Sequence, residues 1–185
     1  MVSGLGLGVA NVAGANGGAD LEFDAIAEVA QASIETADVF AVAKGITFEA
    51  RLHLPDIGDA AALDADWGLG TAPTANSRAD IDHADMVNLA AFHLDGSAAA
   101  IRAQSDDGLS DVAPTDTTIT NNITAGQFKD FIILVRTTGS VEFYIDGARV
   151  LSGTTFAVAA GAALSAFINL EKTSDNTTAT IRVDR

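Results

Sequence analysis

The chain has 185 residues, of which 48% are hydrophobic and only 6% aromatic, so a single domain with a mainly aliphatic core is expected. Ten Lys and Arg against 25 Asp and Glu give a formal charge of −15. This charge argues against nucleic acid or an anionic membrane as a partner, because both are bound by clustered cations. The sequence has no cysteine, which excludes a disulfide framework and thiolate metal sites.

The first segment, residues 1–19, consists mainly of Gly, Ala, Asn and Val and has no charged side chain. It lacks the positive start and the compact apolar run of a secretory signal, and no run in the chain is long enough to cross a bilayer. It also has too few large side chains to build a core. We therefore expect a flexible or extended N-terminal arm over residues 1–19 and one domain over residues 20–185.

An uncharged arm of this kind can lie flat against another subunit, because Gly permits close backbone approach. Ordering it loses about 1–2 kcal/mol of conformational entropy per residue, so the interface would have to be extensive or include strand addition. The apolar side chains expected to anchor the arm are Val2, Leu5, Leu7, Val9 and Val12. A dispensable, disordered tail is the alternative interpretation.

The segment from 21 to 44 is ambiguous. Leu21 and Phe23 begin an alternation typical of a strand, whereas Ile26, Ala30 and later apolar residues have helical spacing. Strands are favoured because the patterns downstream are β, and a short helix is the alternative. Residues 46–55 then form a clear half-buried strand, which Pro55 ends.

Residues 55–84 are polar and predict turns, with Trp67 in a glycine-flanked loop. Residues 86–94 and 98–104 predict a hairpin across Asp95-Gly96-Ser97, and residues 105–122 predict a long loop or a sheet edge. A meander follows over residues 131–150, and two more strands follow at 164–172 and 179–185.

Many strands separated by turns, without a convincing long helix, predict an all-β fold: a two-sheet antiparallel jelly-roll sandwich. The meander fixes which side chains face the core, because Val141, Phe143 and Ile145 alternate with Glu142 and Tyr144. The residues predicted to lie between the sheets are Phe48, Leu52, Phe131, Ile133, Phe143, Ile145, Ile168 and Val183.

The pattern V-x-F-Y-x-D-G from Val141 to Gly147 resembles the hairpin of concanavalin-like (laminin G-like) jelly rolls. With FEARLHLP, WGLG, AAFHLDGS and LEKTSDNTTATIRVDR, it makes approximately residues 46–185 similar to a family of tailed-bacteriophage capsid decoration proteins. The resemblance implies a structural role on the outer capsid surface of a virion, with the phage major capsid protein as partner and a homo-oligomer, most plausibly a trimer. A carbohydrate-binding module that attaches to a bacterial surface glycan is the alternative.

One sequence pattern would indicate an enzyme that hydrolyses polysaccharides. Jelly-roll glucanases place their carboxylates on one strand face as E-x-D-x-E, and retaining hydrolysis needs two carboxyls about 5–5.5 Å apart. Here Glu22, Asp24 and Glu28 share such a face, but Ile26 fills the slot where the acid belongs. Residues 63–67 lack glutamate altogether. We therefore predict that the chain is not an enzyme and hydrolyses no polysaccharide.

The remaining candidates for chemistry are few. The histidines His53, His83 and His93 accompany no G-x-S-x-G elbow and no zinc spacing, so structural roles are expected for them.

No cofactor is expected, with Ca²⁺ as the alternative at an acidic turn that matches no defined calcium loop. The residues of that turn are Ser105, Asp106, Asp107, Ser110 and Asp111. Only Trp67 and Tyr144 could serve as aromatic platforms for a sugar, and packing in the core is expected for Trp67.

Overall fold

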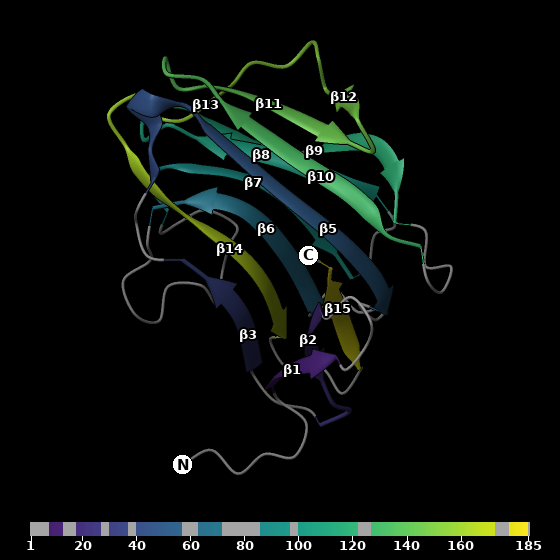
Figure 1. Cartoon of the computed structure of the whole chain (residues 1–185). Coiled ribbons are helices and arrows are strands. Elements are labelled where there is room, and N and C mark those ends of the chain that lie inside the picture. Colours follow the sequence, from purple (N-terminus) through teal and green to yellow (C-terminus); the bar gives the residue numbers. More distant parts are fainter. Residues whose placement is uncertain are drawn as a thin grey trace.

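The computed structural model describes residues 8–12, 18–26, 30–36, 40–56, 63–71, 86–96, 100–121, 127–172 and 178–184. In this part of the chain, no helix is long and apolar enough to span a membrane. The single helical element described is a short 3-10 turn, η1 (Val42–Lys44). All other regular structure is β (Figure 1).

The strands form two sheets in which every pairing is antiparallel. The eight-stranded sheet has the order β1 (Gly8–Val12), β2 (Gly18–Phe23), β15 (Ala179–Val183), β5 (Ile46–Asp56), β10 (Lys129–Val135), β11 (Ser140–Ile145) and β12 (Ala148–Val150), with β13 (Phe156–Ala157) also paired to β11. The seven-stranded sheet has the order β3 (Ala30–Glu35), β14 (Ala163–Lys172), β6 (Leu63–Gly70), β7 (Leu89–Asp95), β8 (Ala100–Asp106) and β9 (Asp111–Thr120), with β4 (Phe40–Ala41) also paired to β14.

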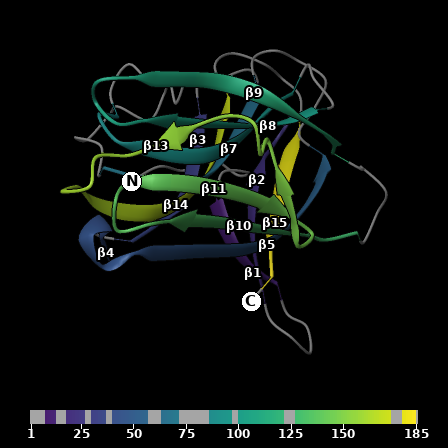
Figure 2. The ribbon, with the colours of Figure 1, turned by 90° about the horizontal axis from the view of Figure 1, so that it is seen from above.

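Seen from above, the two sheets are stacked, with β8 and β9 in one layer and β5 and β10 in the other (Figure 2). This arrangement confirms the predicted two-sheet jelly-roll sandwich. In the described residues of the ambiguous region, which exclude 27–29 and 37–39, the strands are β2, β3 and β4, and the one helical element is η1. The acidic region predicted as a loop or edge contains β9, the edge strand of the seven-stranded sheet.

The placement of Trp67 corrects one prediction. Trp67 lies in strand β6 and not in a loop, and its side chain is fully buried. The sequence did not reveal this strand because Asp and Gly occupy the outward positions of β6, and these residues are typical of polar turns. Its inward positions are nevertheless apolar in strict alternation: Leu63, Ala65, Trp67 and Leu69, all buried.

The centre of the core is a chain of aromatic rings that joins the two sheets. Phe131 of the eight-stranded sheet makes edge contacts with Trp67 and Phe92 of the other sheet, at centroid distances of 4.8 and 5.1 Å. Phe143 makes edge contacts with Phe92 at 5.1 Å and with Phe156 at 4.9 Å. Such geometry adds to the stabilisation from burial alone. The chain has few aromatic side chains, but these rings hold the two sheets together because they lie next to one another in the centre of the core.

The predicted core residues lie where the sequence places them. Seven of the eight are buried, and Val183 is half-buried but packs against the core cluster. The turn of the meander also forms as expected, since Gly139 has a φ of 87° and a Cβ there would lie 2.1 Å from the Val158 carbonyl oxygen. Another residue at this position would be both strained and crowded.

Replacing Phe143 with Ala should lower the free energy of unfolding by about 3–5 kcal/mol, because it removes the ring that joins Phe92 to Phe156. Chemical denaturation monitored by circular dichroism measures this change. The conservative change Tyr144→Phe, one residue along on the outward face, serves as the control and should change stability by less than about 0.5 kcal/mol. Equal stability of Phe143→Ala and the wild type would contradict the assigned core.

Candidate functional site

A row of polar side chains crosses the outer face of the seven-stranded sheet. In the register of the sheet, Asn169 of β14 pairs with Asp66 of β6, Asp66 with His93 of β7, and His93 with Arg102 of β8. Residues directly opposite each other on neighbouring strands point to the same face. The inward neighbours Trp67 and Phe92 are fully buried, so this row faces away from the core.

The row contains a tight carboxylate–imidazole pair. The Nδ1 atom of His93 lies 2.9 Å from Oδ1 of Asp66, and its Nε2 atom lies 3.9 Å from Oδ1 of Asp64. The His93 side chain is 14% exposed and that of Asp66 only 1%. Asp66 therefore fixes the ring from below, while His93 and Asp64 remain accessible at the surface of the row.

The charge of His93 depends on competing effects. Burial lowers its pKa, but the hydrogen bond and the negative charge of Asp66, together with the charge of Asp64, outweigh burial. The pKa of His93 is therefore raised above the ordinary value of 6.5. A histidine in this state can hold or release a proton near neutral pH, which is the property that acid–base chemistry requires.

Three amides lie in or beside the polar row, and two of them, Asn169 and Gln104, are buried. Gln31 of β3 donates from Nε2 to Oδ1 of Asn169 at 2.9 Å, which leaves the Nδ2 group of Asn169 without a partner among the described residues. Gln104 of β8 is fully buried, and neither end of its amide finds a partner in the described part of the chain. Unsatisfied buried amides are unfavourable, and they are typical of places where water or a ligand completes the hydrogen bonding.

An apolar patch borders this polar row on the same face. Phe167 of β14 lies opposite Gly68 of β6, and Gly68 lies opposite Ala91 of β7. Met86, Leu89, Ala91 and Phe167 form a small apolar cluster separate from the main core. All four side chains are buried, with at most 3% exposed, so this cluster is a second small core on the outer side of the sheet and not an exposed surface.

The carboxylates predicted from the glucanase pattern do not meet at this site. Glu22 lies in β2 of the opposite sheet and is exposed, and Asp24 accepts a hydrogen bond from the Ile26 backbone N–H. Glu28 lies outside the described residues. The hydrolytic arrangement tested in the sequence therefore belongs to a strand that does not contribute to the polar row.

The other sequence candidates are placed as follows. His53 is buried in β5 near the Phe128 ring, and His83 lies outside the described residues. At the acidic turn, Asp107 accepts hydrogen bonds from the backbone N–H groups of Leu109 and Ser110.

Among the described residues, no group of three or more His, Asp and Glu is placed to hold a metal ion. Binding of Ca²⁺ at the acidic turn remains untested.

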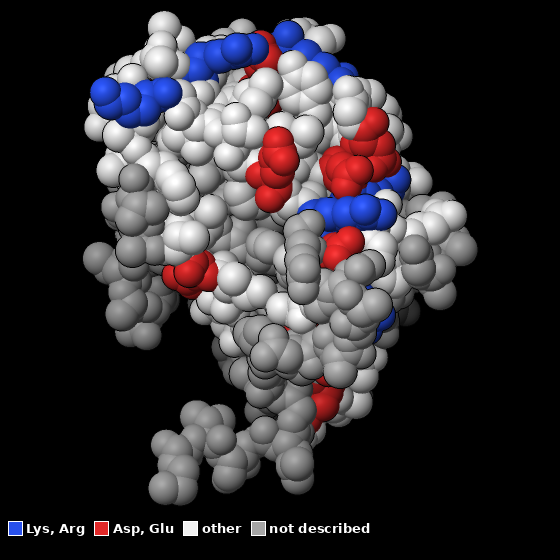
Figure 3. Space-filling view, viewed as in Figure 1, with Lys and Arg blue, Asp and Glu red and all other residues white. Residues whose placement is uncertain are grey.

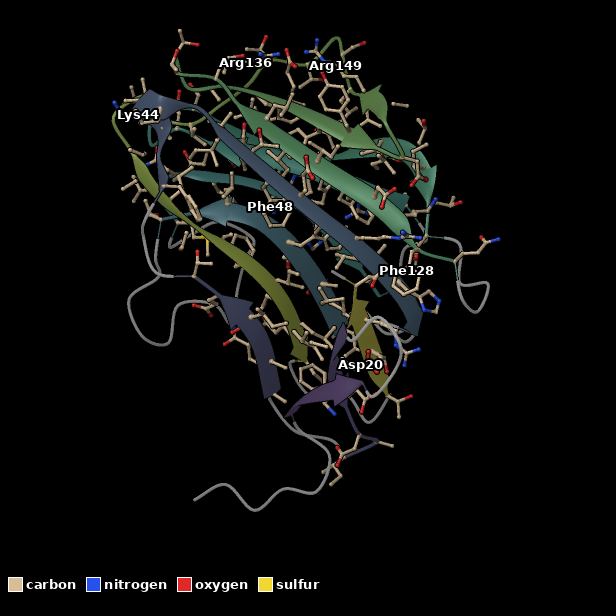
Figure 4. The ribbon with its side chains drawn as sticks, in the orientation of Figure 1. Asp20, Lys44, Phe48, Phe128, Arg136 and Arg149 are labelled. Atoms are coloured by element: carbon tan, nitrogen blue, oxygen red, sulfur yellow. The ribbon has the colours of Figure 1, made fainter. Side chains whose placement is uncertain are left out.

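Tyr144 lies on the outer face of the eight-stranded sheet, as predicted. Its hydroxyl donates to Oε2 of Glu142 at 2.9 Å, and Arg136 donates to the same oxygen at 3.0 Å. These hydrogen bonds lower the pKa of Glu142. Figure 4 shows Arg136 and Arg149 beside this cluster, and Figure 3 shows cations along the same rim of the sheet. Trp67 is buried and offers no platform to a sugar.

The N-terminal arm is described only in part. Residues 8–12 form β1, which pairs with β2 at the edge of the eight-stranded sheet and contains Val9 and Val12. Val2, Leu5 and Leu7 lie outside the described residues. The anchoring role of the arm and the division at residue 19 remain predictions.

Sequence reasoning missed Asp64, Asp66, Asn169 and the role of His93. Their signal was the pattern D-x-D inside the apolar alternation of β6, which places both carboxylates on one strand face. The Asp and Gly residues at the outward positions of this segment are also typical of turns, which conceals the strand. Asn169 lies about one hundred residues further along the chain than Asp66 and could be assigned to the site only from strand pairing.

No protein-family model matches the chain, and no curated protein matches it by sequence. Solved structures do resemble it. A β-glucanase from Bacillus licheniformis aligns with a TM-score of 0.58 at 8% identity, covering 94% of this chain and 79% of the glucanase. An alginate lyase from Pseudomonas aeruginosa gives a TM-score of 0.58 at 12% identity, with coverages of 94% and 82%. A carbohydrate esterase from a Shiga toxin-encoding bacteriophage gives 0.52 at 12% identity, with coverages of 98% and 89%.

These structures overturn the prediction that the chain is not an enzyme. The sequence argument took the missing E-x-D-x-E strand as evidence against catalysis, yet the same sandwich serves a glycoside hydrolase, an alginate lyase and an esterase. One fold can carry unrelated active sites, so the absence of one motif does not exclude the others. At these identities the likeness shows the fold alone, and any chemistry must come from this chain's own residues.

The raised pKa of His93 predicts a pH-dependent stability. Because the pKa of His93 is higher in the folded than in the unfolded protein, protonation of His93 stabilises the folded state. This stabilisation is complete below pH 6.5, the pKa in the unfolded chain, and is lost as the pH rises through the pKa in the folded protein. The difference in melting temperature between the wild type and His93→Gln should therefore be largest at about pH 5.5 and shrink by about pH 8.5. In Asp66→Asn, an NMR titration should give a lower pKa for His93 than in the wild type. A pH-independent difference in melting temperature would contradict the Asp66–His93 pairing.

Proposed function

We propose that this chain is a carbohydrate-active protein that binds a polysaccharide across the outer face of the seven-stranded sheet. The observation that carries the proposal is the row built from Asn169, Asp66, His93 and Arg102 on four adjacent strands. At about 4.8 Å between strands, such a row spans about 14 Å. Asp64, His93 and Arg102 have exposed side-chain fractions of 33%, 14% and 32%, so these groups would contact the hydroxyl groups of an extended ligand. Asn169 and Asp66 are buried and would support them from below.

The His93–Asp66 pair gives this face a group for proton transfer. Asp66 orients the ring at 2.9 Å and favours its protonated form, while Asp64 lies at the other ring nitrogen. A protonated imidazole next to carboxylates supplies both the acid and the base that cleavage of a sugar chain requires. The enzymes that share the fold act on polysaccharides or carbohydrate esters by name, which supports carbohydrate as the ligand class.

Binding is tested with mixed-linkage β-glucan and with alginate, by affinity electrophoresis and calorimetry. His93→Gln should weaken binding of the preferred polymer by roughly tenfold, because it removes a charge-assisted contact. Asp66→Asn should weaken binding in the same direction, because His93 loses the carboxylate that orients its ring and favours its charged form. Arg149→Gln, on the opposite sheet, is the matched control and should bind as the wild type does. If neither polymer binds, or if all variants bind equally, the site is not on this face.

Cleavage is a separate readout of the same proposal. If the wild type releases reducing ends or an unsaturated product from either polymer, His93→Gln should lower the rate by about 10²-fold or more, the usual contribution of general acid–base catalysis. Retention of the full rate in His93→Gln would assign proton transfer to another group.

The capsid role remains a second proposal and rests on the sequence resemblance over approximately residues 46–185. It would place a homo-oligomer, most plausibly a trimer, on the outer surface of a phage capsid, bound to the major capsid protein. One feature favours it: β1 is an edge strand formed from the N-terminal segment, and edge strands can pair with another chain. Deleting residues 2–18 should lower occupancy on purified capsids, and undiminished occupancy would argue against this arm as the anchor.

A further inference from the structure

A second row of side chains, here called the acidic row, runs beside the polar row on the outer face of the seven-stranded sheet. Glu171 of β14 pairs with Asp64 of β6, and Asp64 pairs with Asp95 of β7. Each of the three lies two positions along its strand from a member of the polar row, so all of them point to the same outer face. Three adjacent strands therefore carry carboxylates next to the polar row.

The acidic row and the polar row form one continuous surface. Asp64 and Asp95 have exposed side-chain fractions of 33% and 24%, whereas Glu171 is buried. The Nε2 atom of His93 lies 3.9 Å from Asp64, and a guanidinium nitrogen of Arg102 lies 4.0 Å from Asp95. A ligand that contacts His93 and Arg102 would therefore also meet the two exposed carboxylates.

Positive charge is scarce on this face. Among the described residues of the seven-stranded sheet, the only Lys and Arg are Arg102 and Lys172. Lys172 is fully buried and donates to two backbone carbonyls, so it does not reach the surface. Even with His93 protonated, the four carboxylates of the two rows outnumber the two cations, and Asp116 of β9 lies opposite Arg102 as well.

The chemistry of these groups limits what the ligand can carry. A carboxylate accepts hydrogen bonds and cannot donate them, so Asp64 and Asp95 need donors from the ligand. A sugar hydroxyl donates to a carboxylate and also accepts from a guanidinium such as that of Arg102. A carboxylate or sulfate on the sugar offers Asp64 and Asp95 no donor and adds a like charge, which is unfavourable.

A buried amide next to the acidic row independently indicates that a group from outside the protein binds here. Asn169 is fully buried, and its Nδ2 group has no partner among the described residues. It lies two residues from Glu171 on the same face of β14. An open donor in this position is typical of a place where water or a ligand completes the hydrogen bonding.

We propose that this face binds an uncharged polysaccharide and rejects polyuronates and sulfated polymers, with Asp64 and Asp95 accepting hydrogen bonds from hydroxyl groups of the ligand. The inference rests on the proposed carbohydrate function and names the class of substrate within it. Specificity arises from repulsion of the wrong polymer as much as from attraction of the right one. A polymer of amino sugars would be attracted by the whole protein of charge −15 and would not need these two rows.

The test compares one polymer in two charge states. Mixed-linkage β-glucan oligosaccharides are titrated into the full chain by calorimetry, next to the same oligosaccharides with their C6 hydroxymethyl groups oxidised to carboxylates. At low salt the neutral form should bind at least about tenfold more tightly. Raising the salt to about 0.5 M should strengthen binding of the oxidised form and leave the neutral form unchanged, because salt screens repulsion between charges.

A pair of variants assigns the discrimination to the acidic row. Asp64→Asn removes one charge at nearly constant size, so it should weaken binding of the neutral form, strengthen binding of the oxidised form and reduce the preference about threefold or more. Glu49→Gln removes the same charge from an exposed position on β5 of the opposite sheet and is the matched control. It should leave the preference unchanged.

The outcomes separate this inference from the function on which it rests. Equal or tighter binding of the oxidised form, weakened by His93→Gln, would overturn the inference and leave the carbohydrate site in place. Binding of the oxidised form that falls with salt would also overturn it, and so would an equal loss of preference in Asp64→Asn and Glu49→Gln. Failure of both forms to bind would contradict the proposed function itself, and this inference with it.

Discussion

The contact between Trp67 and Phe92 is the interaction on which the placement of the candidate site depends. Their rings stack between β6 and β7 at a centroid distance of 5.9 Å, and both contact Phe131 of the opposite sheet. Because side chains alternate along a strand, burying these two rings turns Asp66 and His93 to the outer face. A slip of one residue would bury the carboxylate and imidazole and expose both rings, so the core strongly specifies the register.

The register that places Asp66 and His93 side by side also explains how this acidic protein tolerates a buried carboxylate. Asp66 is almost completely buried, which would be unfavourable for an isolated charge. The Nδ1 atom of His93 lies 2.9 Å from Asp66, and the raised pKa of His93 favours its protonated form. The positive charge of the imidazole therefore offsets the cost of burying the carboxylate. The remaining amides of the row, Gln104 and Asn169, have hydrogen-bonding capacity that the described residues do not use. Such unsatisfied buried amides are typical of places where a water molecule or another group completes the hydrogen bonding.

The two faces of the sandwich differ in what they offer a partner. The seven-stranded sheet presents side chains, because its inner strands are all paired in order from β3 to β9. The eight-stranded sheet instead presents a cluster of Tyr144, Glu142, Arg136 and Arg149, whose side chains hydrogen-bond or ion-pair through Glu142.

The sequence by itself determined the fold class, the strands β5, β7, β8, β10, β11, β12, β14 and β15, and most of the core, because alternation with period two is a local property of each strand. It did not determine β6, β9 or the short β13. Phe143 and Ile145, for example, were assigned correctly from the meander alone. Only the tertiary structure decided that Trp67 belongs to a strand, that β14 and β15 lie in different sheets, and that Asn169, Asp66 and His93 meet in one row. These features depend on which strands pair, and pairing between segments far apart in the chain is set by the packing of the whole core rather than by any local pattern.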